Sequence, residues 1–138
     1  MKFVGIIKEY EYTSSIKIGR SIAELRQSSE EPKSLVKIIN YLENGVIIMP
    51  FSRYVSDEEG GPQVPLIYYT DGRWIWVSYL TFFLKKGYYS LLSEEFIKSI
   101  GQNNFVIPTL DDGNKVEAIR YYYSIYHPEL LKDDDLKD

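Results

Sequence analysis

Residues 66–77, which read LIYYTDGRWIWV, decide the fold of this chain. Both halves of the stretch are rich in the β-branched and aromatic residues that favour strands. Between them, Asp71-Gly72 is a preferred two-residue turn of a β-hairpin. Counting outward from this turn pairs Thr70 with Arg73 and Tyr69 with Trp74. The sequence therefore predicts an antiparallel hairpin at this position.

Both faces of the predicted hairpin are apolar, because side chains alternate between the two faces of a strand. Such a hairpin is either covered on both sides or offers one face to a partner. We expect Trp76, deeper in its strand, to lie in the core, and Trp74, next to the turn, to be partly exposed with Tyr69. One face carries Ile67, Tyr69, Trp74 and Trp76, and the other carries Leu66, Tyr68, Ile75 and Val77.

Further elements are predicted on both sides of the hairpin. Upstream, the patterns predict a strand over Phe3–Glu9, a short helix opened by a Ser21–Glu24 capping box, a helix from Pro32 to Gly45 and a buried strand over Val46–Met49. Downstream, they predict helices over Val77–Lys86, Ser93–Gly101 and Asp111–Tyr126, and a short strand over Phe105–Ile107. The buried stripe of the last helix is expected to comprise Val116, Ile119, Tyr123 and Tyr126.

This order of elements lacks a regular βαβ alternation, which favours an α+β fold. We expect a small antiparallel or mixed sheet with an Asp-Gly β-hairpin, flanked by about four helices. A length of 138 residues suits one domain. The prediction is a single α+β domain over residues 1–128, followed by an acidic, frayed tail over residues 129–138.

The composition excludes several classes of protein. Without cysteine, the chain has neither disulfides nor thiolate metal sites. Its most apolar window, Trp74–Leu84, is too short to span a bilayer, and its first residues do not resemble a signal peptide. A net charge of −4 without a basic stripe is atypical of a nucleic-acid binder. We therefore expect a cytoplasmic protein that binds neither membranes nor nucleic acid.

Residues that carry catalytic chemistry are scarce. The only histidine, His127, adjoins Pro128, where a surface position at a helix end is more typical than a general base. The sequence has no nucleophile motif, phosphate-binding loop or dinucleotide fingerprint. The acidic groups Asp57-Glu58-Glu59 and Asp111-Asp112 lack the spacing of a calcium loop. We expect no enzymatic activity, no cofactor and no metal.

Thirteen tyrosines, six phenylalanines and two tryptophans suit either a tyrosine-rich core periphery or a recognition surface. The acidic loop over Ser56–Pro65 is most simply a solubilising loop, but its place beside the aromatic hairpin also suits a docking element for a basic partner. The two tryptophans are either core residues or an interaction hot spot. The candidate partner-binding residues are Asp57, Glu58, Glu59, Tyr69, Arg73 and Trp74.

A family pattern runs through residues 18–100. Its marks are Gly19-Arg20-Ser21-Ile22, Ile39-Asn40-Tyr41-Leu42 followed by Gly45, the Thr70–Trp76 run, Leu80–Leu84 and Glu95-Phe96. The pattern resembles small bacterial immunity proteins associated with polymorphic or contact-dependent growth inhibition toxins. Members of that group often carry proline where this chain has Val77. The resemblance implies a protein that binds and neutralises a cognate toxin domain in the cytoplasm, and it assigns no catalytic residue.

The charge of the chain favours a toxin of nuclease type. Such toxins tend to be basic because they hold phosphates, and an acidic, tyrosine-rich inhibitor suits a basic target. The alternative is a small-molecule-binding domain or weak enzyme that uses the Tyr/Trp-rich hairpin as a pocket wall. A constitutive subunit or scaffold is a third interpretation. The sequence indicates no particular oligomeric state.

Overall fold

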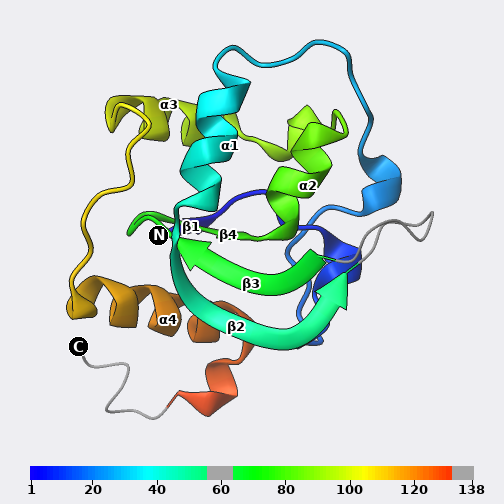
Figure 1. Ribbon diagram of the computed structural model, residues 1–138. Coiled ribbons are helices and arrows are strands. Elements are labelled where there is room, and N and C mark those ends of the chain that lie inside the picture. The colour runs from blue at the N-terminus through cyan, green and yellow to red at the C-terminus, as the bar shows by residue number, and fades with distance from the viewer. Residues whose placement is uncertain (56–63, 132–138) are drawn as a thin grey trace.

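The computed structural model describes residues 1–55 and 64–131 (Figure 1). Its centre is a mixed sheet of four strands in the order β1-β4-β3-β2. Strand β1 pairs parallel with β4, whereas the β4–β3 and β3–β2 pairs are antiparallel. The strands comprise β1 (Lys2–Phe3), β2 (Val46–Val55), β3 (Val64–Thr70) and β4 (Trp74–Val77).

Four α-helices surround the sheet, which confirms the predicted α+β fold. Figure 1 shows α1, α2 and α3 on one side of the sheet and α4 on the other. The α-helices comprise α1 (Leu35–Glu43), α2 (Tyr79–Lys85), α3 (Glu94–Gln102) and α4 (Asp112–Tyr126). Short 3-10 turns comprise η1 (Lys8–Tyr10), η2 (Ile22–Glu24), η3 (Tyr89–Leu91) and η4 (Pro128–Leu130). Among the described residues, no helix is both long and apolar enough to cross a membrane.

The hairpin forms, but its predicted register is wrong by two residues. Thr70 pairs with Ile75, and Tyr69 pairs with Trp76. The backbone N–H of Asp71 donates to Trp74 O (3.3 Å), so Asp71 extends the ladder and the chain turns at Gly72, whose φ is +96°. Side chains alternate with a period of two residues, so a shift of two leaves each side chain on its predicted face. The apolar composition of both faces is therefore confirmed.

Both tryptophans lie in the core. Trp76 is buried as predicted, and its indole N–H donates to Leu42 O (3.1 Å). The expectation that Trp74 is partly exposed is wrong, since its exposed fraction is 6%. The ring of Phe96 in α3 covers it, with the ring centroids 5.2 Å apart.

The first part of the chain contains less regular structure than the sequence predicts. Only Lys2–Phe3 of the first strand forms, because the chain turns at Gly5 (φ +68°). The Ser21 capping box is absent, since the Ser21 hydroxyl donates to Glu9 instead (2.6 Å). Helix α1 begins at Leu35, three residues after Pro32, behind a left-handed Ser34 (φ +64°).

Downstream boundaries also differ from the predictions. Val77 is the last residue of β4, so α2 begins two residues later than expected. No strand forms over Phe105–Ile107, where Phe105 has a φ of +58°. Ser93 does cap α3, accepting from Phe96 N (3.1 Å).

Helix α4 begins at the predicted place, but its buried face shares only Tyr126 with the predicted stripe. Asp111 caps it and forms a capping box with Asn114. The buried residues are Ala118, Tyr122 and Tyr126, whereas Val116 of the predicted stripe is 44% exposed. The ring of Tyr122 packs on Tyr68 of the sheet at 5.1 Å. Three consecutive tyrosines, residues 121–123, offered an aromatic ring to any face, so the sequence pattern did not select one.

Candidate functional site

One face of β2 and β3 carries apolar side chains that remain exposed to solvent. The pairing places Ile47 opposite Tyr69, Pro50 opposite Ile67 and Tyr54 opposite Pro65, so all six share this face. Ile47 is 53% exposed and Tyr54 is 62% exposed. The two prolines are also exposed, and Ile67 and Tyr69 are half-buried. We call this surface the β2–β3 apolar strip: Ile47, Pro50, Tyr54, Pro65, Ile67 and Tyr69.

The strip continues the face of the sheet that is buried at β4. Tyr69 lies opposite Trp76, and Trp76 packs against Tyr41 of α1 and Phe96 of α3, with ring centroids 6.1 and 6.0 Å away. The same apolar face is thus covered by helices over β4 and exposed over β2.

Gly45 marks the inner boundary of the strip, where the chain leaves α1 and enters β2. A Cβ atom at this position would lie 2.5 Å from the Trp76 ring and 2.9 Å from the Cβ of Tyr69. Real Cβ atoms do not approach other heavy atoms this closely, so only glycine lets the backbone pass. The end of α1 therefore packs tightly against Trp76, which is buried, and Tyr69, which is half-buried.

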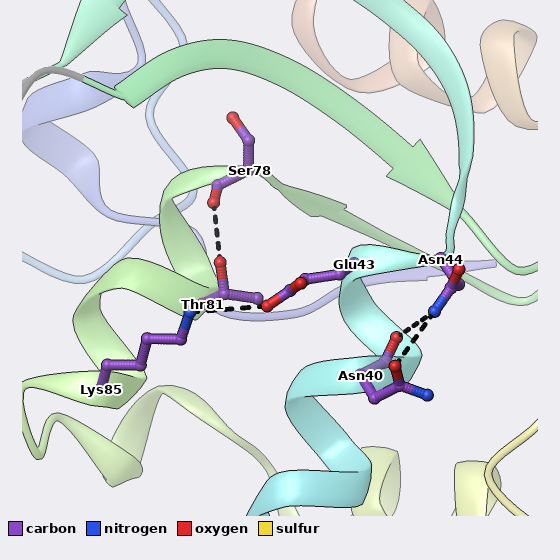
Figure 2. Close-up of polar contacts among 6 residues, drawn as sticks. All are labelled: Asn40, Glu43, Asn44, Ser78, Thr81 and Lys85. Atoms are coloured by element: carbon purple, nitrogen blue, oxygen red, sulfur yellow. Dashed lines mark hydrogen bonds and ion pairs between the residues drawn. The ribbon is translucent and has the colours of Figure 1, made fainter.

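A small hollow of about 270 Å³ lies at this boundary, lined in part by Tyr69, Trp76 and Thr81. Figure 2 shows polar contacts of α1 and α2 near it, and three of the residues drawn, Glu43, Ser78 and Thr81, line the hollow. The Lys85 ammonium lies 3.5 Å from the Glu43 carboxylate, and the Thr81 hydroxyl donates to Ser78 O (3.3 Å). Glu43 and Lys85 are both more than half exposed, so their ion pair contributes little stability. These groups form a hydrophilic rim beside the strip.

The Asn44 amide donates to Asn40 O (2.7 Å) at the end of α1 (Figure 2), and these two residues line a separate hollow with Phe105. An uncharged centre with aromatic and aliphatic side chains, bordered by polar groups, is the usual anatomy of a protein–protein interface. The strip also lies on β2, which is an edge strand of the sheet.

The structure separates the residues that the sequence singled out. Tyr69 belongs to the strip, whereas Trp74 is buried beneath Phe96. Arg73 is exposed and lines another cleft, of about 470 Å³, together with Lys98. That cleft and the hollow beside the strip share no lining residue. The acidic residues Asp57, Glu58 and Glu59 lie outside the described residues.

The sequence reasoning missed Ile47, Pro50 and Tyr54. It treated Val46–Met49 as a complete buried strand, but β2 continues to Val55, and of those four residues only Ile48 is buried. Pro50 was the available signal, because proline within a strand indicates an edge strand. If Pro50 had been taken as a sign of an edge strand, the apolar residues around it would have predicted an exposed apolar edge.

Several buried tyrosine hydroxyls take part in hydrogen bonds within the core. Burial raises the pKa of Tyr68, Tyr79 and Tyr126 above the ordinary tyrosine value, so these hydroxyls stay protonated at neutral pH. Tyr79 accepts from Ile7 N (2.9 Å), and Tyr126 donates to the Glu11 carboxylate (2.7 Å). Within residues 1–55 and 64–131, no cluster of three histidine, aspartate or glutamate side chains is arranged to hold a metal ion.

Comparisons of this chain with protein-family models, curated proteins and solved structures find no match. The likeness to bacterial immunity proteins therefore stays a prediction from the sequence pattern.

Proposed function

We propose that this protein binds a partner protein through the β2–β3 apolar strip. The partner in this proposal is a cognate bacterial toxin domain, which the binding neutralises in the cytoplasm. The observation that carries the proposal is the exposure of Ile47 and Tyr54 on a face that is core where it passes over β4. The sequence pattern of the immunity proteins supports the identity of the partner.

The residue types of the strip suit a binding surface in physical terms. Tyrosine brings a large, stiff ring with a polar tip, and buried tyrosines are frequent hot spots of interfaces. The two prolines, Pro50 and Pro65, are already restricted in φ, so they lose little further backbone freedom on binding. Tyr54 is the most exposed of the aromatic rings here. We assign it as the main anchor.

The net charge of −4 supports a basic partner. Opposite charges on two proteins accelerate their encounter, and the acceleration weakens as salt rises. A nuclease toxin has such a basic surface because it holds phosphates. In this proposal, the acidic Asp57, Glu58 and Glu59 assist the encounter, while the uncharged strip forms the contact.

Co-expression with the toxin domain encoded by a neighbouring gene tests this function. We expect the chain to restore growth of cells that produce the toxin and to co-purify with it as a stable complex. Nanomolar affinity corresponds to about −12 kcal/mol, which is sufficient to survive gel filtration. Growth arrest that persists in the presence of the chain, together with separate elution of the two proteins, would contradict the proposal.

A further inference from the structure

A second concave surface lies at the other edge of the sheet. It is a cleft of about 460 Å³ beside β1, bordered by the segment of residues 18–20, η3 and the second half of α4. Its volume falls within the range of sites for small organic ligands. The apolar walls comprise Phe3, Ile6, Ile18, Leu91, Tyr121 and Ile125.

The two charged residues that line this cleft are both basic. Lys2 and Arg20 line it, and no carboxylate occurs among the described lining residues, although acidic residues outnumber basic ones in the chain as a whole. The Lys2 ammonium already lies 2.6 Å from the Glu95 carboxylate, which neutralises much of its charge. The Arg20 guanidinium donates one N–H to Ser90 O (3.1 Å). This bond leaves the fork of Arg20 with further donors for an oxyanion.

The backbone that carries Arg20 is held in place before any ligand arrives. Arg20 N donates to Ile6 O (3.1 Å), and Arg20 O accepts from Lys8 N (2.9 Å). Gly19 permits this close approach, because a Cβ there would lie 2.6 Å from Ile6 O. Loss of conformational freedom is a main cost of binding, so a wall fixed in advance favours affinity.

A buried carboxylate fixes the same wall from the inside. Glu11 is 2% exposed, and its two oxygens accept from Ile18 N (2.9 Å) and Gly19 N (3.2 Å). The Tyr126 hydroxyl donates to the same group (2.7 Å). Burying a carboxylate is expensive unless it is fully hydrogen-bonded. Here the hydrogen bonds hold the loop that presents Ile18 and Arg20 to the cleft.

From this geometry we infer that the cleft binds a small amphipathic anion, with the oxyanion head on Arg20 and the apolar body against Phe3, Tyr121 and Ile125. Lys2 supplies a weaker, secondary attraction. The site shares no residue with the β2–β3 apolar strip and lies at the opposite edge of the sheet. It is therefore independent of the proposed partner binding.

Decanoate is a suitable probe, with decan-1-ol as its neutral counterpart. Titration of the full chain, followed by calorimetry and by amide NMR shifts, should show saturable decanoate binding with the largest shifts at Gly19 and Arg20. Decan-1-ol should bind at least about tenfold more weakly, because it lacks the charge that Arg20 recognises. Equal binding of the two probes, or no saturation up to about 10 mM decanoate, a level typical of non-specific contact, would overturn the inference.

Two pairs of variants locate the site. Arg20→Gln should weaken decanoate binding about tenfold or more, whereas Lys98→Gln, which removes a cation outside this cleft, should leave it unchanged. Ile18→Glu should abolish binding by repulsion. Ile16→Glu, which changes an exposed isoleucine two residues earlier that does not line the cleft, should not. Equal effects within either pair would contradict the assignment. Binding of poly-glutamate without decanoate would show a contact for acidic proteins instead and would also overturn it.

Discussion

At the scale of single residues, the Asp71 carboxylate organises the turn of the hairpin. Its Oδ1 accepts from Arg73 N (2.9 Å) and Trp74 N (2.8 Å), and its Oδ2 accepts from the Tyr41 hydroxyl (2.6 Å). Asp71 is buried, so each of these bonds offsets part of the cost of removing a charge from water. Burial and the neighbouring Asp71 raise the pKa of Tyr41, which keeps its hydroxyl a donor at neutral pH.

Replacement of Tyr41 by phenylalanine tests this role. Tyr41→Phe removes one donor from a buried carboxylate, and we expect the free energy of unfolding to fall by about 2 kcal/mol. Urea denaturation measures the change. The control is Tyr54→Phe, which removes an exposed hydroxyl and should change stability by less than about 0.5 kcal/mol. A similar small change in both variants would show that the Tyr41–Asp71 bond does not stabilise the fold.

At the scale of elements, local signals predicted those parts of the fold that depend on local chemistry. The Ser93 and Asp111 caps act within one turn of helix, and both form. The Ser21 cap failed because a residue distant in sequence, Glu9, binds the hydroxyl. In the hairpin, the bonds that draw Asp71 into the ladder are local, from Arg73 N and Trp74 N, but the carboxylate is also held by Tyr41, thirty residues away. Contacts between distant segments leave no periodic trace in the sequence, and they decide these details.

The same limit applies to the candidate site. The alternation of residues 66–70 placed Tyr69 and Ile67 on one face, and the structure confirms that placement. It did not reveal how far the helix layer extends over that face, because coverage depends on where α1 and α3 pack. The strip was therefore predictable as an apolar face but not as an exposed one.

Two glycine variants test the packing of α1 against the sheet. Gly45→Ala places a methyl group 2.5 Å from the Trp76 ring, and we expect it to destabilise the protein by about 1–3 kcal/mol. Gly101→Ala in α3 meets nothing within 4 Å, so it should stabilise by about 0.5–1 kcal/mol through helix propensity. Thermal unfolding of both variants decides the matter. A neutral Gly45→Ala would mean that the junction between α1 and β2 is looser than described.

At the scale of the whole molecule, the two concave or apolar surfaces lie at opposite edges of one sheet. Strand β1 borders the cleft that contains Arg20, and β2 carries the apolar strip. The helices α1, α2 and α3 cover the strip's face only in part, while α4 packs on the other face (Figure 1). This arrangement allows a partner protein to occupy the strip without displacing the core or closing the cleft.

The affinity of Ile47→Arg for the toxin domain, measured beside that of Val116→Arg, tests the central claim most directly. Both residues are exposed and β-branched, but Val116 lies on α4, which packs against the other face of the sheet. We expect Ile47→Arg to weaken binding by at least about 2 kcal/mol, roughly thirtyfold, with a melting temperature within a few degrees of the unmodified chain. Val116→Arg should change the affinity by less than about threefold. Unchanged affinity of a folded Ile47→Arg, or a larger loss in Val116→Arg, would contradict the assignment of the β2–β3 apolar strip as the binding surface.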